Sequence, residues 1–259
     1  MTEQPLLRVD SISKSFGAVK ALDNVSLQVR QGEIVGLCGD NGAGKSTLVK
    51  IIAGVLQPDS GSVLWDGQLV AIGGPDDSKR LGIETLYQDL GLLDNLDIVA
   101  NTFLGRELVS RWLAGLVEVL RNREMTIETK RILSELQIDL GSVREKVQVL
   151  SGGQRQAVAL GRAVGWGRRL VLLDEPTAAL GVRESSQALD LIRRLKDRDV
   201  AAILISHNLE HVFAVADRVV VLRQGILRGE TDREHLDGDE VVSWITGSSE
   251  YKKHARLFA

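Results

Sequence analysis

The sequence predicts an α/β fold with a central, mostly parallel sheet, and three stretches carry this prediction. An apolar run at residues 34–38 is followed by a glycine-rich stretch at 39–47 and then by a helix-like stretch at 48–53. Two further apolar runs, at 170–173 and 200–205, do not alternate between polar and apolar residues. Strands of this kind are typical of parallel sheets whose two faces are both covered.

The N-terminal part shows the pattern of an antiparallel sheet instead. Residues 7–12 and 25–29 alternate between apolar and polar side chains. The pair Asp66-Gly67 lies between two short strand-like runs, which favours a two-residue hairpin turn. A second hairpin is expected around Gln224. We therefore predict an N-terminal antiparallel β-subdomain beside the central sheet.

From about residue 89 the strand patterns give way to helical ones. Three of these follow one another, at 96–104, 112–121 and 127–136. In the second, apolar residues recur with the spacing of one helix face, at positions 112, 113, 116, 117 and 120. A further amphipathic helix is predicted over 183–198.

The organisation of the whole chain follows from these patterns. Residues of about 89–165 are predicted to be a helical insert, because no stretch rich in Pro, Gly or Ser separates them from their flanks. The chain is expected to be a single domain over 1–259. Its polar tail, from about 248 to 259, is expected to be loosely ordered.

Composition narrows the class of protein. The chain has 259 residues, of which 44% are hydrophobic and 26% charged, with a net charge of −3. A sequence-wide positive field that would attract nucleic acid is therefore absent. The single cysteine, Cys38, suits a reducing compartment. No signal-peptide pattern or run of about 20 apolar residues is found, so a link to a membrane is expected to go through a partner.

The glycine-rich stretch at 39–47 matches the pattern G-x-x-x-x-G-K-[ST] in its required context of strand, turn and helix. Glycines let successive backbone N–H groups turn inward and surround an anion, and the following helix adds its positive dipole end. Lys45 is expected on the β- and γ-phosphates of a nucleotide, and the Ser46 hydroxyl on Mg²⁺. The alternative is a βα turn that binds nothing.

Two carboxylates end the apolar run at 170–173. Asp174 is expected to hold Mg²⁺ through water, and Glu175 to orient or deprotonate an attacking water molecule, because ligands bind at the carboxyl ends of parallel strands. The alternative is an acidic turn closed by Pro176. Gln88, at the end of another predicted strand, could touch Mg²⁺ and the same water.

The stretch Ser151-Gly152-Gly153-Gln154 opens a helix that is predicted to run to about 165. Ser-x-x-Gln before an amphipathic run is a capping box, which many helices have without any further role. Two glycines in a first helical turn are costly, at about 1 kcal/mol each relative to alanine. They are explained if a phosphate must approach those N–H groups.

Two side chains have competing interpretations. His207 follows the apolar run at 200–205 and is expected beside a γ-phosphate, whereas residues 207–211 also match the zinc pattern H-x-x-E-H. That pattern needs both histidines on one helix, and His211 is instead expected to be solvated, as are His235 and His254. Phe16 either stacks on an adenine ring or packs in the core.

Together these motifs resemble the nucleotide-binding subunit of ATP-binding cassette (ABC) transporters, over residues of about 6–245. In that family the order is an adenine-stacking aromatic, the Walker A loop, the Q-loop, the signature, Walker B and the switch histidine. The resemblance implies a P-loop NTPase fold of ABC type. It also implies ATP contacts from Phe16, Gly39, Asp40, Asn41, Gly42, Ala43, Gly44, Lys45, Ser46, Thr47, Ser151, Gly152, Gly153 and Gln154, Mg²⁺ contacts from Ser46, Gln88 and Asp174, and catalytic roles for Glu175, His207 and Gln88.

The resemblance further implies partners. Two copies of such a cassette pair head to tail, so that each ATP lies between the Walker A loop of one copy and the signature of the other. The stretches 84–90, 101–107 and 176–182 look like those of monosaccharide importers for ribose, xylose and fructose. These work on a polytopic membrane permease at the cytoplasmic face of the inner membrane, and indirectly with a periplasmic sugar-binding protein.

One position departs from the family, and two alternatives stay open. Gly181 stands where the family usually carries an aspartate that contacts the opposite cassette. One alternative function is an ABC ATPase without a membrane partner, which acts on a soluble partner such as the ribosome or on DNA. The other is a nucleotide-dependent regulatory module without turnover, against which Glu175 and His207 argue.

Overall fold

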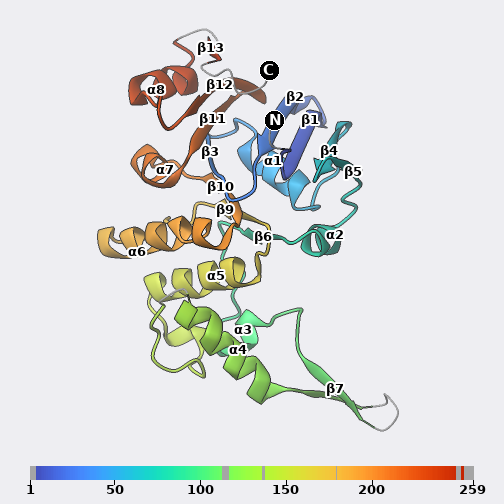
Figure 1. Ribbon diagram of the computed structural model, residues 1–259, viewed down its shortest axis with the longest axis vertical. Helices are drawn as coiled ribbons and strands as arrows, with labels where there is room; N and C mark the ends of the chain where they lie inside the picture. The colour runs from blue at the N-terminus through green and yellow to red at the C-terminus, as the bar shows by residue number, and fades with distance from the viewer. Residues whose placement is uncertain (1–3, 113–116, 136–137, 179, 249–251, 254–259) are drawn as a thin grey trace.

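Figure 1 shows the computed structural model of the chain, which describes residues 4–112, 117–135, 138–178, 180–248 and 252–253. Its strands are β1 (Leu7–Phe16), β2 (Val19–Val29), β3 (Ile34–Cys38), β4 (Ser60–Trp65), β5 (Gln68–Val70), β6 (Ile83–Leu86), β7 (Val109–Trp112), β8 (Val117–Leu120), β9 (Leu170–Asp174), β10 (Ala201–Ile205), β11 (Arg218–Arg223), β12 (Ile226–Asp232) and β13 (Lys252–Lys253). Its helices are α1 (Lys45–Ile52), α2 (Pro75–Arg80), α3 (Ile98–Thr102), α4 (Asn122–Glu135), α5 (Gly152–Trp166), α6 (Val182–Arg193), α7 (Leu209–Val215) and α8 (Gly238–Thr246), with 3-10 turns at Val147–Val149 and Lys196–Arg198.

The central sheet has the strand order β13-β12-β11-β3-β10-β9-β6. All neighbouring pairs in it are parallel except β11 with β12. Strands β3, β9 and β10 are the apolar runs of the sequence, and nearly every residue in them is buried. The mostly parallel sheet that the sequence predicts is therefore confirmed.

Alternate residues of each central strand face two separate cores. Val35 and Leu37 of β3 belong to a core with α1 and the N-terminal strands, whereas Ile34 and Cys38 belong to a core with α5, α6 and α7. Burial on both faces explains why these strands lack polar alternation. It also places α1 and α5 on opposite faces of the sheet.

The N-terminal strands form a separate antiparallel sheet, in the order β2-β1-β4-β5, as predicted. Asp66 and Gly67 join β4 to β5 with φ angles of 49° and 72°. Two successive residues with positive φ are the signature of the type I′ turn, which matches the twist of a hairpin. Gln224, also at positive φ, turns β11 into β12, so both predicted hairpins are confirmed.

The helix predicted over residues 112–121 is wrong. Residues Val109–Trp112 and Val117–Leu120 are instead the antiparallel strands β7 and β8, which extend away from α3 and α4 at one end of the molecule (Figure 1). Residues 113–116 lie outside the described part of the chain. The apolar spacing fitted both structures, and the β-branched valines of β8 favour a strand. The neighbouring predictions hold, with α4 beginning earlier and α3 being shorter than expected.

The predicted polar tail lies mostly outside the described residues. Only Ser248 and Lys252–Lys253 of it are described, and the latter pair with β12 as the short parallel strand β13. Among the described residues, none of the helices combines the length and apolar character needed to cross a bilayer.

A buried ion-pair cluster joins the two sheets and leads to a stability prediction. Arg218, 4% exposed, is 2.7 Å from Glu33 and 2.5 Å from Glu230, both also buried, and it donates to the Gln28 carbonyl. Replacing one member of a buried cluster leaves uncompensated charge. We expect Arg218→Met to lower the free energy of unfolding by about 3–5 kcal/mol in urea titrations.

The matched control is Arg131, whose pairs with Glu128 and Glu135 lie on the exposed face of α4. Exposed pairs contribute about 0–1 kcal/mol, so Arg131→Met should change the unfolding free energy little. Equal effects of the two variants would contradict this assignment.

Candidate nucleotide-binding site

The predicted catalytic and phosphate-binding residues converge at one edge of the central sheet. The parallel strands β3, β10, β9 and β6 are neighbours in that order. Their carboxyl ends lead into Gly39, His207, Glu175 and Gln88 respectively. The carboxyl edge of an open α/β sheet is where such folds bind their ligands. Residues separated by more than 160 positions in the sequence thus share one site.

Glycine is required by the shape of the loop over residues 39–47. Gly39, Gly42 and Gly44 all have φ in the left-handed region, at 146°, 77° and 105°. A β-carbon on Gly39 would lie 2.1 Å from the Leu222 carbonyl oxygen, and one on Gly44 would lie 2.5 Å from that of Ala21. Side chains other than hydrogen therefore do not fit at either position.

Lys45 begins α1, and its side chain curls back into the loop. Its ammonium donates to the carbonyl oxygens of Gly39, at 2.8 Å, and Asp40, at 2.9 Å. Burial lowers the pKa of Lys45, and the nearby carboxylate of Glu175 opposes that effect. Asp40, Asn41, Gly42 and Ser46 are exposed, whereas Ala43 is buried and Thr47 is half-buried. The loop presents a charged, open rim of the kind that an anion requires.

Ser46 and Asp174 meet although they come from different elements. Burial raises the pKa of Asp174, and the nearby Ser46 hydroxyl counteracts this effect. Gln88 is exposed just beyond β6. Ser46, Asp174 and Gln88 all offer hard oxygen donors. Among the described residues, no cluster of three His, Cys, Asp or Glu residues suited to a metal is found. Such a sparse oxygen set fits Mg²⁺, which keeps water and phosphate ligands.

Glu175 has strained backbone and a poorly solvated carboxylate. Its φ is 53°, and its amide donates to the Ile205 carbonyl, which holds the residue beside β10. Its Oε1 is 3.3 Å from Nε2 of His207 but has no hydrogen-bond partner among the described residues. Burial raises the pKa of Glu175, and His207 counteracts this. A carboxylate with these properties suits general-base chemistry.

The zinc interpretation does not fit the structure. His207 precedes α7 whereas His211 lies within it, so the two histidines do not share a helix. The expectation that His211 is solvated is wrong, because its Nδ1 is 3.0 Å from Oγ1 of the buried Thr177. This contact ties α7 to the segment after Glu175, and no sequence signal indicated it. His235 is exposed beside Asp232 as expected, and His254 lies outside the described residues.

Phe16 is exposed at the end of β1, which argues against the core-packing alternative. The residue is 48% exposed, and the Lys14 ammonium lies 5.8 Å from the centre of its ring. It pairs with Val19 at the start of β2, and Ala21, two residues further on, contacts Gly44. The exposed aromatic ring therefore belongs to the hairpin that adjoins the glycine-rich loop.

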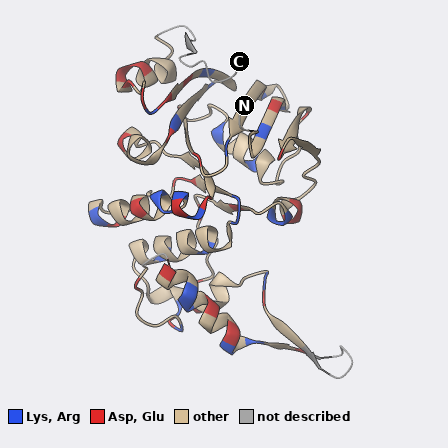
Figure 2. Cartoon of the chain, in the orientation of Figure 1, with Lys and Arg blue, Asp and Glu red and all other residues tan. Residues whose placement is uncertain are grey.

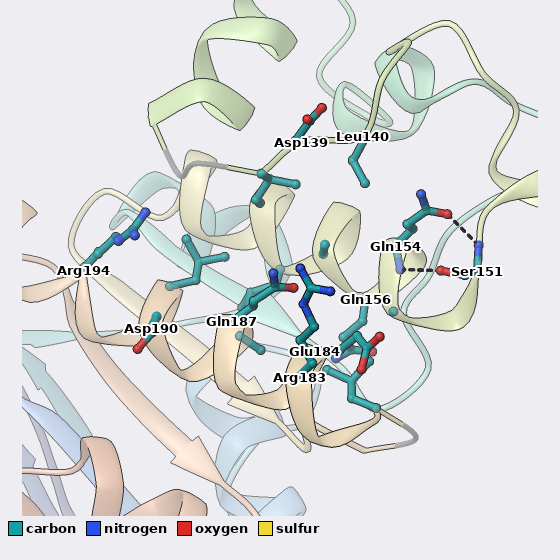
Figure 3. Close-up of a pocket in the computed structure, with 17 residues that line it drawn as sticks. Asp139, Leu140, Ser151, Gln154, Gln156, Arg183, Glu184, Gln187, Asp190 and Arg194 are labelled. Carbon is teal, nitrogen blue, oxygen red and sulfur yellow. Dashed lines mark hydrogen bonds between the residues drawn. The ribbon is translucent and has the colours of Figure 1, made fainter.

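Ser151 caps α5 with both hydrogen bonds of a capping box (Figure 3). Its hydroxyl accepts from the Gln154 amide at 3.2 Å, and the Gln154 side chain accepts from the Ser151 amide at 2.9 Å. A β-carbon on Gly152 would meet no atom within 4 Å, whereas one on Gly153 would lie 2.7 Å from Cγ of Glu184. Packing thus explains Gly153, and only Gly152 leaves open space for an anion.

The Glu184 side chain lies between α5 and α6, and it approaches Gly181 as well as Gly153. The helix start borders a pocket of about 740 Å³ between α5 and α6, with Glu184 on its α6 wall (Figure 3). A β-carbon on Gly181 would lie 2.6 Å from Oε2 of Glu184. A carboxylate is therefore present beside Gly181, although it is carried by the third residue of α6.

The two glycines give a matched prediction. Gly152→Ala should raise the free energy of unfolding by about 0.4–1 kcal/mol, because the alanine fits a helical turn without strain. The same variant should lower ATP hydrolysis, because the methyl group covers the open N–H groups. Urea titration and phosphate release measure the two effects. Gly153→Ala, which displaces Glu184, should gain no stability, and a loss of stability in Gly152→Ala would contradict this account.

Comparison with known proteins decides the family. The family model described as "ABC transporter" matches residues 22–178, which include the glycine-rich loop and the two strand-end carboxylates. The chain belongs to the ABC transporter family. The resemblance found in the sequence is thereby confirmed, and with it the assignment as an ATP-binding ATPase.

Three curated relatives are sugar-import proteins. The xylose/arabinose import ATP-binding protein XylG of Sulfolobus acidocaldarius is 44% identical over 93% of this chain and 94% of its own. The fructose import ATP-binding protein FrcA of Rhizobium meliloti is 38% identical over 98% and 99%. The ribose import ATP-binding protein RbsA of Yersinia pestis is 41% identical over 95% of this chain, which spans only 47% of that relative.

Solved structures confirm the predicted fold class. The ABC transporter cassette MJ1267 in its ADP conformation superposes with a TM-score of 0.78 at 26% identity, covering 94% of this chain and 99% of its own. The cassette MJ0796, in a dimeric post-hydrolysis state bound to ADP and Pi, shares the fold with a TM-score of 0.74 at 24% identity, covering 89% and 100%.

Proposed function

We propose that this chain hydrolyses ATP to power the import of a monosaccharide through a partner membrane permease. The observation that carries the proposal is the convergence of residues 39–47, Asp174, Glu175, His207 and Gln88 on adjacent strand ends. The relatives are named as import proteins for xylose and arabinose, fructose and ribose, and these names supply the substrate class.

In this proposal the loop at 39–47 binds the phosphates through its backbone N–H groups. Lys45 exchanges its contacts with the loop carbonyls for contacts with the β- and γ-phosphates. Ser46, Asp174 and Gln88 would hold Mg²⁺, which when bound would neutralise charge on the phosphates. Phe16 would stack on the adenine ring.

Glu175 is proposed as the general base. Its raised pKa gives the carboxylate more affinity for a proton taken from water, and its Oε1 makes no hydrogen bond to the described residues that would have to be broken first. His207 would donate to the γ-phosphate and position Glu175. Gln88 would orient the same water molecule.

A second copy of the chain would complete the site. Ser151–Gln154 begin a helix on the opposite face of the sheet from α1, so these residues are proposed to close the nucleotide site of a facing copy rather than their own. The open space at Gly152 supports an approaching phosphate. The dimeric form named for the MJ0796 cassette supports this homodimer.

The proposed location is the cytoplasmic face of the inner membrane, on the permease, with a periplasmic sugar-binding protein as an indirect partner. We infer a single nucleotide-binding domain over 1–259 with its insert at about 89–165. No nucleic acid is expected as a partner, since acidic and basic residues are mixed on α4 and α6 (Figure 2) and the net charge is −3.

Uptake in cells tests this function. Cells that depend on this chain should lose uptake of one labelled sugar among xylose, arabinose, ribose and fructose when Lys45→Ala replaces the wild-type chain, because the variant loses nucleotide binding. Unchanged uptake of all four sugars, with the chain co-purifying with a soluble partner instead of a polytopic membrane protein, would favour the non-transport alternative.

A further inference from the structure

An arginine in α5 contacts the segment at residues 88–92, here called the Gln88 segment. The Arg162 guanidinium donates to the carbonyl oxygens of Leu90, at 2.8 Å, and Gly91, at 3.0 Å. Leu90 stands two residues after Gln88 and packs against the core that includes α5. One side chain therefore joins the segment that follows β6 to helix α5.

Further contacts reinforce the same junction. Arg106, which follows α3, pairs with Glu84 of β6 at 2.5 Å, and both side chains are largely buried. The Arg106 guanidinium also lies 5.4 Å from the ring centre of Trp166, at the end of α5. The Trp166 indole N–H donates to the Thr102 carbonyl at 2.8 Å. Strand β6, the end of α3 and α5 are thus connected around Arg162, and they adjoin in Figure 1.

Arg162 cannot release these carbonyls without cost. Burial lowers the pKa of its guanidinium, and the Glu84 carboxylate opposes that effect. Arg162 is half-buried. A guanidinium that is partly removed from water needs acceptors for its donors, and the two backbone carbonyls supply them. The planar fork reaches both carbonyls at once, which the single ammonium group of a lysine does less well.

We infer that Arg162 is a positioning residue that makes the Gln88 segment and the helix beginning at Ser151 move as one unit. Arg162 lies eleven positions after Ser151, which corresponds to about 16 Å along the helix axis. The inference rests on the proposed function, in which Gln88 contacts the chain's own nucleotide and Ser151 contacts that of the facing copy. Through Arg162, each nucleotide then affects how tightly the other is held.

Two variants and a control test the inference. Arg162→Met removes the donors, and Arg162→Lys keeps the charge but weakens the two-carbonyl contact. Arg168→Met is the control, because Arg168 is exposed just beyond the C-terminal end of α5. For each full-length protein, we would measure amide hydrogen exchange of residues 88–92 without nucleotide. The dependence of phosphate release on ATP concentration is the second measurement.

Arg162→Met is expected to speed amide exchange at 88–92 about fivefold or more, because the segment loses both hydrogen bonds from the guanidinium. It should also bring the Hill coefficient for ATP close to 1, because coupling between two sites is typically worth about 5–150-fold in affinity. Arg162→Lys should have a smaller effect in the same direction, and it decides the question if the Met variant does not fold. The control should match the wild type in both measurements.

Unchanged exchange and an unchanged Hill coefficient in both Arg162 variants would overturn the inference while leaving the proposed function intact. If the wild-type chain showed neither ATP-dependent association nor cooperative hydrolysis, the paired-cassette function would fail and the coupling role with it. Faster exchange at 88–92 in Arg162→Met would even then support the structural tie between Arg162 and this segment.

Discussion

Glu175→Gln is expected to lower the turnover of ATP by about 10²–10⁴-fold, the range that general-base catalysis supplies, while ATP still binds. The amide preserves the size of the side chain and its place beside His207, but it cannot accept a proton from water. Nucleotide contacts in the proposed site come from residues 39–47, which the change leaves in place.

The folded state should tolerate this change. Burial raises the pKa of Glu175 in the folded chain, so the charged form is disfavoured there. The free energy of unfolding therefore falls as the pH rises above the pKa that the carboxyl has in the unfolded chain. At neutral pH the charged side chain destabilises the folded state. Glu175→Gln removes that cost and should be at least as stable as the wild type at pH 7.

Phosphate release under saturating ATP and equilibrium binding of a fluorescent ATP analogue separate the two properties. Glu210→Gln is the matched control, because Glu210 is exposed on α7 three residues after His207. If Glu175→Gln kept more than about a tenth of the wild-type turnover, another group would have to act as the base.

Ser151→Arg is expected to abolish ATP-driven association of two chains together with hydrolysis, while each chain still binds ATP. The bulky side chain would stand in front of Gly152, where the proposed phosphate of the facing copy must approach. Sedimentation with and without ATP, in a Glu175→Gln background that prevents turnover, measures the association.

Loss of the helix cap must be separated from loss of the anion site. Removing a serine N-cap costs about 0.5–2 kcal/mol, so Ser151→Arg also weakens α5. Ser151→Asp keeps a good cap but places a negative charge where the phosphate would dock. It should fold with wild-type stability and still fail to associate. Normal association of either variant would disprove the nucleotide sandwich.

Local patterns in the chain predicted most of the elements that make the site. The loop at 39–47, the carboxylates after β9 and the capping box at Ser151 each depend on neighbouring residues, which is why they can be recognised in order along the chain. The wrong helix prediction at 112–121 also comes from relying on local patterns. A short apolar run fits a helix face and a hairpin equally well, and no local contact chooses between them.

The sequence by itself determined the family, the nucleotide-binding loop and the identity of the candidate catalytic side chains. The tertiary structure decided which of them are neighbours: the order β3-β10-β9-β6 sets Gln88, Glu175, His207 and the loop side by side, and it brings Ser46 to Asp174. It also decided that Arg162 donates hydrogen bonds to the Gln88 segment and that His211 contacts Thr177. The physical reason is that strand order and side-chain contacts arise from long-range packing, whereas residue spacing along the chain reports only local geometry.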